Sequence, residues 1–311
     1  MVFTITVTGQ DINNNSSNQS TNPINLLSYK FPTTAVFDNH SIAVVSISMY
    51  LSWHNIDAEL YNNNIFTYTW LDPSGSYQTY TVNFPNGLYE VPALNNYLQY
   101  TLIQRKQFSI DSTTGAYVFY ITLNINPTAY SIDTVCYQVP QFNPASPPTA
   151  GIIPQFTQAV PYAFIPQVQF NANFNQICGY TQYVKSPTLV NDATTAAAAG
   201  TPLPSSIVFQ SDVAPQVNPV PTLVLSCPAI NNPYAQPTST VYSLNATGVI
   251  GSQIQVFPPQ LVWLQLKKGS YSNLTFTWVG ANGLPVFIRD PNMTIVLAIR
   301  DNNTDVINIQ T

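Results

Sequence analysis

Hydrophobic and polar residues alternate along most of the chain, with the two-residue period of β-strands that bury one face. The alternation is clearest in five stretches, residues 43–53, 66–70, 117–123, 274–278 and 295–299. Their apolar faces are expected to be Ala43, Val45, Ile47, Met49, Leu51 and Trp53; Phe66, Tyr68 and Trp70; Tyr117, Phe119, Ile121 and Leu123; Leu274, Phe276 and Trp278; and Ile295, Leu297 and Ile299.

Turn-forming residues lie where these stretches end. Asp72-Pro73-Ser74-Gly75 and the run from Asp111 to Gly115 predict hairpin loops, and Asn282-Gly283 suits a tight primed turn, which needs two positive φ angles. About ten strands at such short spacing predict an all-β sandwich or barrel.

One segment has a helical period instead. From Pro92 to Arg105, the residues Leu94, Leu98, Thr101 and Leu102 recur at the spacing of one helix face. Proline suits the first turn of a helix, and Arg105 and Lys106 suit its C-terminal end. We expect one amphipathic helix near 92–105, packed on the sandwich.

Two stretches differ in composition. Residues 10–23 are polar and predict a loop or arm, and residues from about 140 to 220 are rich in Pro, Ala, Gln and Thr. We expect residues 1–139 and 221–311 to form the two parts of one sandwich, and residues 140–220 to be a partly β, loop-rich insertion or a set of long loops.

Charged side chains are scarce. Asp, Glu, Lys and Arg make up 7% of the residues, against roughly 25% in an ordinary soluble domain. A chain of this size exposes about 12,900 Å² when folded, so one charge lies on about 600 Å² instead of about 165 Å². Because charge keeps proteins apart in solution, we expect other subunits to cover much of this surface. The alternative is an extracellular or lectin-like surface of Asn, Thr, Ser and Gln.

The sequence does not favour a nucleic-acid partner, a disulfide or zinc framework, or a membrane span. The net charge is −5, and the adjacent basic pairs, Arg105-Lys106 and Lys267-Lys268, are too small to follow a phosphate backbone, so we expect no sequence-specific nucleic-acid partner. Cys136, Cys178 and Cys227 are too few and too far apart for a disulfide framework or a zinc site. No apolar run is long enough for a membrane span, and no signal peptide is visible, so an intracellular protein is expected.

Residues that perform enzyme chemistry are rare. The two histidines are His40 and His54, and neither lies in a nucleophile elbow. His54 follows a predicted strand and is expected to form hydrogen bonds in a loop. Asp57 and Glu59 are the closest acidic pair and are expected to be solvated, although paired carboxylates can hydrolyse glycosides where a fold brings them together. We predict no catalytic residue, no cofactor, no cofactor-binding residue and no metal ligand.

The segment from Pro85 to Leu98 reads Pro-Asn-Gly-Leu-Tyr-Glu-Val-Pro-Ala-Leu-Asn-Asn-Tyr-Leu, a strand end that leads into a short helix. It resembles the minor capsid (penton) proteins of virophages and polinton-like viruses, and the closest fit is to those of mavirus-like virophages. The stretch 61–68, the segment Ile177-Cys178-Gly179-Tyr180 and the run from Leu261 to Arg300 are also similar to that family. The Pro/Ala-rich middle of the chain is not.

The resemblance implies a single jelly roll that forms a homopentamer at the vertices of an icosahedral capsid, beside capsomers of the major capsid protein of the same virus. It implies a chain that is made and assembled in the host cytoplasm and resides in the virion capsid. It transfers no catalytic residue. A double jelly-roll major capsid protein would need roughly twice one sandwich of 200–250 residues, so the length favours a penton protein.

Two other functions remain open. A carbohydrate- or receptor-binding β-sandwich would use the abundant Tyr and Trp side chains to stack on sugars, and an insertion that forms a receptor-binding knob would combine this function with a capsid role. A hydrolase would use dispersed carboxylates such as Asp57 and Glu59.

Overall fold

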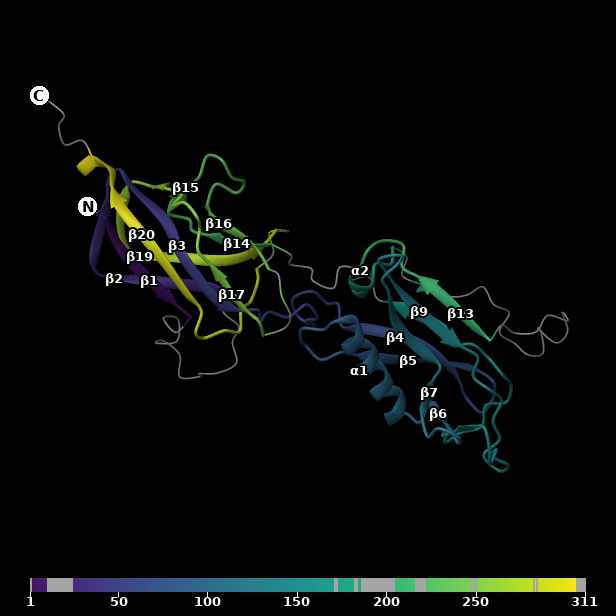
Figure 1. Cartoon of the computed structure of the whole chain (residues 1–311). Coiled ribbons are helices and arrows are strands. Elements are labelled where there is room, and N and C mark those ends of the chain that lie inside the picture. The colour runs from purple at the N-terminus through teal and green to yellow at the C-terminus, as the bar shows by residue number, and fades with distance from the viewer. Residues whose placement is uncertain are drawn as a thin grey trace, which may run out of the picture. The chain divides into compact units, whose positions relative to one another are not determined.

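A computed structural model describes residues 2–9, 25–170, 173–181, 184–185, 205–215, 222–246, 248, 251–281, 283 and 285–305. The chain is mostly antiparallel β-strand, which confirms the all-β prediction. It divides into two compact units, Met1–Trp53 with Val220–Thr311, and His54–Pro219. We call them the jelly-roll unit and the inserted unit (Figure 1). The polar stretch 10–23 and Asn282 of the predicted primed turn lie outside the described residues.

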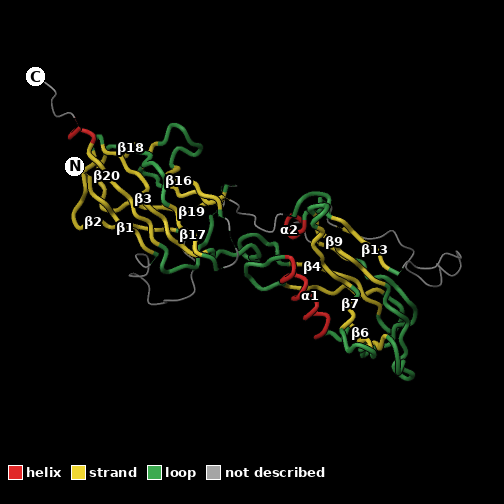
Figure 2. The backbone as a smooth tube through the Cα atoms, in the orientation of Figure 1, coloured by secondary structure: helices red, strands yellow, loops and turns green. Residues whose placement is uncertain are grey.

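Two antiparallel sheets form the jelly-roll unit (Figure 2). The strands are β1 (Val2–Thr8), β2 (Leu26–Phe37), β3 (His40–Tyr50), β14 (Thr222–Ser226), β15 (Ile230–Asn231), β16 (Thr240–Asn245), β17 (Gln253–Val256), β18 (Leu264–Leu266), β19 (Gly269–Gly280) and β20 (Thr294–Asp301). One sheet has the order β1-β20-β3-β18-β15, with β17 also paired to β3, and the other has the order β16-β14-β19-β2. A short 3₁₀ helix, η2 (Asn302–Asp305), follows β20.

The pairing of these strands is nested. β1 pairs with β20, β2 with β19, β3 with β17 and β18, and β14 with β16. Read inward from its two ends, the unit therefore pairs its first strand with its last, its second with its second-last and its third with its third-last, while the inner strand β14 pairs with β16. A long antiparallel hairpin rolled into two sheets has this pattern, which is the jelly roll. The inserted unit enters between β3 and β14.

The buried faces of this unit follow the predicted alternation, with one exception. Leu274, Phe276 and Trp278 and the three isoleucine and leucine positions of β20 are buried, as expected. In β3 the expected face is confirmed at Ala43 and from Ile47 onward. Between them the pairing with β20 shifts at a β-bulge, so that Val44 is also buried and Val45 is half-buried. A bulge adds one residue to a strand and moves the side chains beyond it to the other face.

The described residues of the inserted unit form three small sheets and two helices. Its elements are β4 (Ile65–Leu71), β5 (Tyr77–Asn83), α1 (Val91–Gln104), β6 (Phe108–Asp111), β7 (Tyr117–Phe119), β8 (Ile121–Asn126), β9 (Ser131–Tyr137), β10 (Ile152–Pro154), β11 (Val168–Phe170), α2 (Phe174–Cys178), β12 (Val184–Lys185) and β13 (Ser206–Gln210). The sheet orders are β12-β11-β4-β5, β13-β9-β8 and β10-β6-β7. The two predicted hairpin loops are confirmed, since they join β4 to β5 and β6 to β7.

The helix α1 lies where the sequence predicts one, with Pro92 in its first turn, and it packs along β8. Its residues Leu94, Leu98 and Leu102 are fully buried. They belong to a single apolar core that also contains Phe66, Tyr68 and Trp70 of β4, and residues of β8, β9 and β11. Burial of a leucine side chain contributes about 1.5–3 kcal/mol. The three leucines on this face of α1 therefore stabilise the packing of the helix on the core of this unit.

The division into units differs from the expected boundaries. Residues 54–139, which the sequence pattern assigns to the first part of the sandwich, lie in the same compact unit as residues 140–219. Helix α1 and the strands β4 and β8 therefore belong to the inserted unit and share its core. Alternation identifies a strand and its buried face, but it does not say which sheet the strand joins.

The segment Ile177-Cys178-Gly179-Tyr180 contains the end of α2 and forms hydrogen bonds with residues 209–213 of the same unit. Gly179 has a φ of 78° at the helix C-cap, and its carbonyl accepts a hydrogen bond from the backbone N–H of Val213 at 3.0 Å. The ring of Tyr180 stacks on Phe170, and its hydroxyl donates to the carbonyl oxygen of Phe209 at 2.8 Å. Glycine is needed because a Cβ atom here would overlap the Val213 carbonyl oxygen.

We expect Gly179→Ala to destabilise the protein by about 2–4 kcal/mol, because it combines a left-handed backbone with a backbone clash. Gly115→Ala is the matched control, since Gly115 has a φ of 70° and a Cβ atom added there would meet no heavy atom within 4 Å; it should cost only about 1 kcal/mol. Urea unfolding curves measure both values. Equal losses would contradict the close approach of Val213.

Candidate functional site

The described part of the chain offers neither a metal centre nor a membrane-spanning helix. Within these residues, no three His, Cys, Asp or Glu side chains lie close enough together to hold a metal ion. In the same part of the chain, no helix has the length and apolar composition that crossing a membrane requires. The candidate sites are therefore a polar loop that contains the predicted His54, Asp57 and Glu59, and the exposed apolar side chains.

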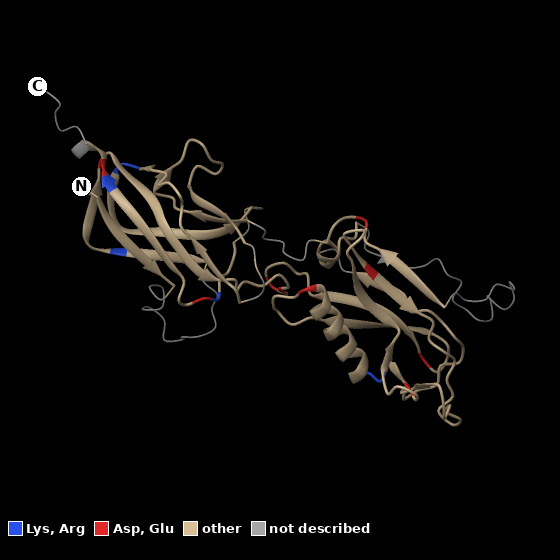
Figure 3. Ribbon diagram, in the orientation of Figure 1, with Lys and Arg blue, Asp and Glu red and all other residues tan. Residues whose placement is uncertain are grey.

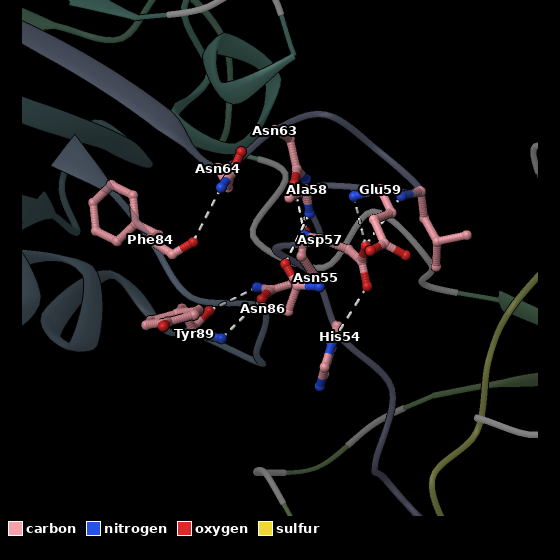
Figure 4. Close-up of polar contacts among 11 residues, drawn as sticks. His54, Asn55, Asp57, Ala58, Glu59, Asn63, Asn64, Phe84, Asn86 and Tyr89 are labelled. Atoms are coloured by element: carbon pink, nitrogen blue, oxygen red, sulfur yellow. Dashed lines mark hydrogen bonds and ion pairs between the residues drawn. The ribbon is translucent and has the colours of Figure 1, made fainter. Parts of the chain in front are cut away.

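The polar loop at residues 54–64 is fastened to the segment 84–89 by amide side chains (Figure 4). Asn55 pairs with the backbone of Tyr89: its Oδ1 accepts from the N–H at 2.8 Å and its Nδ2 donates to the carbonyl at 2.7 Å. Gly87 exchanges backbone hydrogen bonds with Ile56 at 2.9–3.0 Å. Asn86 Oδ1 accepts from the N–H of Ala58 at 2.9 Å. The segment 84–89 therefore holds the polar loop in place.

Asp57 is buried inside this loop, and its carboxylate is used for structure. Its Oδ1 accepts hydrogen bonds from the backbone N–H groups of Glu59 and Leu60, both at 3.0 Å. Its Oδ2 lies 3.4 Å from His54 Nδ1, and its own N–H donates to Asn63 Oδ1 at 2.8 Å. A buried carboxylate that accepts hydrogen bonds from the backbone of its own turn stabilises that turn.

The prediction for the acidic pair is therefore wrong for one member. Glu59 is exposed, as expected, whereas Asp57 is only 5% exposed. The expectation that His54 forms hydrogen-bonding contacts in a loop agrees with its contact to Asp57. The other histidine, His40, lies at the start of β3 in the jelly-roll unit, where its Nδ1 is 3.0 Å from the carbonyl oxygen of Asp38. His54, Asp57 and Glu59 thus share the polar loop of the inserted unit, whereas His40 belongs to the jelly-roll unit.

The three cysteines are buried and unpaired with one another. Burial raises the pKa of the Cys136 thiol to about 12 and that of Cys227 to about 11. Burial also raises the pKa of Cys178 well above its ordinary value. Thiols of this kind behave as small apolar side chains, because the reactive thiolate is suppressed.

Exposed apolar side chains lie at two opposite edges of the jelly-roll unit. The first edge is formed by β1 and β2, which end their respective sheets, and it exposes Val2 and Val36 by 61% and 67%. The second edge is the segment 257–263 between β17 and β18, on the far side of β3, where Phe257 and Val262 are 70% and 64% exposed. Exposed apolar residues gathered in this way indicate surfaces that another molecule covers.

Charged residues are few on these edges (Figure 3): Lys30 of β2 is exposed on the first edge, and Arg300 contacts Trp263 of the second edge. Several gather at one end of the sandwich, where β2 leads into β3 and β18 leads into β19: Asp38, Lys267, Lys268, Arg300 and Asp301. The pair Lys268 Nζ and Asp38 Oδ2, 2.9 Å apart, is exposed and contributes little to stability. Among the described strands of this unit, Lys30 is the one charged residue away from a strand end.

The second edge also contains an aromatic anchor. Trp263 is half-buried, and the guanidinium carbon of Arg300 lies 4.4 Å from the centre of its ring. Such a cation–π contact holds the ring in one orientation beside Leu261 and Val262. Alternation in the sequence gives no signal for this position of Trp263, because it does not reveal a segment that leaves the sheet.

We expect Asp57→Ala to lower the free energy of unfolding by about 2 kcal/mol, because two backbone N–H groups lose a charged acceptor. Glu59→Ala should change it by less than about 0.5 kcal/mol, as an exposed substitution does. Urea denaturation monitored by tryptophan fluorescence measures both. An unchanged free energy of unfolding in Asp57→Ala would show that the carboxylate is not needed to hold the loop.

The native thiols should resist modification at pH 8. With pKa values of about 11 and 12, no more than roughly one in a thousand of the Cys227 and Cys136 thiols is ionised at that pH. We therefore expect no reaction with a thiol reagent such as dithionitrobenzoate in the folded protein, and reaction of all three cysteines in guanidinium chloride. Rapid reaction of a native thiol would place that cysteine at the surface.

Comparisons with known proteins add little at the level of sequence. No protein-family model matches the chain, and no curated protein matches it. Among solved structures, the chain is similar to a crystal structure of the SeMet-labeled mavirus penton protein, with a TM-score of 0.44 and 8% sequence identity, over 96% of this chain and 97% of that chain. A likeness at this level does not assign the chain to a family or give it a function.

Proposed function

We propose that the chain is a structural capsid protein of an icosahedral virus, and that its jelly-roll unit forms a homopentameric vertex capsomer. The observation that carries the proposal is the pair of exposed apolar edges on opposite sides of a sandwich with almost no charge on its described strands. Jelly rolls of two Greek keys are common in viral capsids and in lectins. The fold is shared by capsid proteins and lectins and does not distinguish between them. The exposed apolar edges of the surface are what favour the capsid function.

The two edges suit a closed ring. When different patches of identical subunits meet head to tail, the assembly closes if the rotation between neighbours is right. The first edge would then pack against the second edge of the next copy. Covering a valine or phenylalanine side chain contributes about 1.5–3 kcal/mol. The described strands of this unit carry few charged side chains, namely Lys30, Arg300 and Asp301, which limits the cost of burying charge.

Further partners follow from the same proposal. A vertex capsomer contacts major capsid protein capsomers of the same virus, and its place is the virion capsid after assembly in the host cytoplasm. The resemblance of the segment 85–98 to penton proteins supports this assignment. Catalysis by Asp57 and Glu59 is disfavoured, because the Asp57 carboxylate is buried and accepts hydrogen bonds from the loop itself.

The solution mass tests the proposal. We expect a particle of about 170 kDa, five times the 34.3 kDa of one chain, by light scattering after size exclusion. Val36→Asp on the first edge and Val262→Asp on the second edge should each give monomers, with an affinity loss of at least about 100-fold. Tyr130→Asp is the control: Tyr130 is 80% exposed in the inserted unit, with a φ of 51° that Asp tolerates.

Mixing the two edge variants separates a ring from other assemblies. Each variant retains one intact edge, so an equimolar mixture should form dimers that cannot grow or close. A wild-type chain that stays monomeric at high concentration, and that does not co-assemble with the major capsid protein, would overturn the proposal. Ring formation by either variant alone would show that its edge is not the interface.

A further inference from the structure

The inserted unit contains a cavity of about 210 Å³ that neither the capsid proposal nor the loop chemistry uses. It lies where β4 and β5 meet the end of α1 and the segment 156–160. Trp70, Tyr80 and Phe156 supply aromatic walls, and Arg105 and Lys106 supply two positive charges. The volume equals that of about seven water molecules, which is the size of a single ring-shaped ligand rather than of a peptide.

Arg105 is held at the cavity by its neighbours. Its guanidinium carbon lies 5.3 Å from the ring centre of Tyr80 and 5.7 Å from that of Tyr68. Nη1 donates to the Tyr68 hydroxyl at 3.0 Å, and Nη2 donates to the Thr81 carbonyl at 2.6 Å. A guanidinium has five N–H donors, so three remain for a ligand. Because these contacts already fix the Arg105 side chain, a ligand would bind without the entropy cost of ordering it.

The hydroxyl of Tyr68 links Arg105 to the side-chain amide of Gln107. Because it accepts from Arg105, it donates to Oε1 of the buried Gln107. Burial raises the pKa of Tyr68 to about 12, so the hydroxyl keeps the proton that it donates. The Oε1 atom of Gln107 is therefore used as the acceptor of this hydrogen bond. The Nε2 group, which has two N–H donors, is left to bind a ligand in the cavity that Gln107 lines.

No acidic side chain balances the two cations. Among the described residues, no Asp or Glu lines the cavity, and neither Arg105 nor Lys106 forms an ion pair. The pair stands directly after α1, at the blue segment there in Figure 3. In a chain with only 8 Lys and Arg residues, two adjacent cations without a carboxylate partner leave a concentrated positive potential that attracts an anion.

We propose that this cavity binds one ring of an acidic sugar. The carboxylate or sulfate group would contact Arg105 and Lys106, since guanidinium groups bind such anions with two parallel hydrogen bonds. The apolar face of the ring would lie against the aromatic walls. Gln107, with Thr157 and Gln158 at the exposed side, would serve the hydroxyl groups as neutral donors and acceptors. The lining therefore combines aromatic and aliphatic walls with a comparable number of polar and charged side chains, as a site for a polar ring needs.

Titration of the full chain tests the assignment. The probes are the methyl glycoside of N-acetylneuraminic acid and glucuronic acid, with galactose as a neutral ring and acetate as an anion without a ring. Isothermal calorimetry should give saturable binding of at least one acidic sugar, with galactose and acetate weaker by at least about tenfold. Binding does not depend on oligomer formation, so its failure leaves the capsid proposal untouched.

Variants locate the site. Lys106 has a φ of 56°, which Asn tolerates, so Lys106→Asn should keep the fold and weaken binding by about fivefold. Arg105→Lys should weaken it by more than about tenfold, because the two-pronged contact is lost. Lys268→Ala removes an exposed lysine from the jelly-roll unit and is the matched control, with no change expected. Thermal unfolding of each variant reports on its fold.

Several outcomes would overturn the inference. Equal affinity for galactose would show that charge does not select the ligand, and equal affinity for acetate would show that the ring does not. Binding of an acidic peptide in preference to every sugar would replace the ligand class. Absence of binding by the folded wild-type chain, or unchanged binding by the folded Lys106→Asn variant, would remove the site.

Discussion

The nested antiparallel pairing of the jelly-roll unit is the constraint on which the rest of the structure depends. Residues from opposite ends of the chain must meet in register, as Ile299 of β20 meets Ile42 of β3 and Phe276 of β19 meets Leu27 of β2. Because the entropy cost of closing a loop rises only slowly with its length, a whole compact unit can interrupt this pairing between β3 and β14. The inserted unit offsets its own ordering cost by burying its own core.

The scarcity of charge has different consequences in the two units. In the jelly-roll unit it leaves apolar edges, such as those at Val36 and Val262, with few charged side chains near them, which suits contacts between copies. In the inserted unit the few charges have assigned positions: Asp57 holds a loop, and Arg105 faces a cavity through contacts with Tyr68 and Thr81.

Much of the fold could be predicted from the chain, and less of the candidate sites. Alternation identifies the buried faces of β19 and β20, and the leucine spacing identifies α1, because both signals are local periods set by backbone geometry. The burial of Asp57 and the cavity at Arg105 have no such signal, since each depends on residues distant in the chain, such as Asn86 and Phe156. The Arg105-Lys106 pair is visible in the sequence, but only as a basic pair too small for nucleic acid.

The amino-acid sequence by itself determined that this protein is an all-β chain with one long helix and an exceptionally sparse set of charges, because composition and short-range periodicity express those properties directly. Only the tertiary structure decided that β4, α1 and β8 belong to the inserted unit, that a bulge at Val45 changes the buried face of β3, and that two apolar edges lie on opposite sides of the sandwich. These features depend on which strands pair, and strand pairing is a long-range choice that a local pattern does not encode.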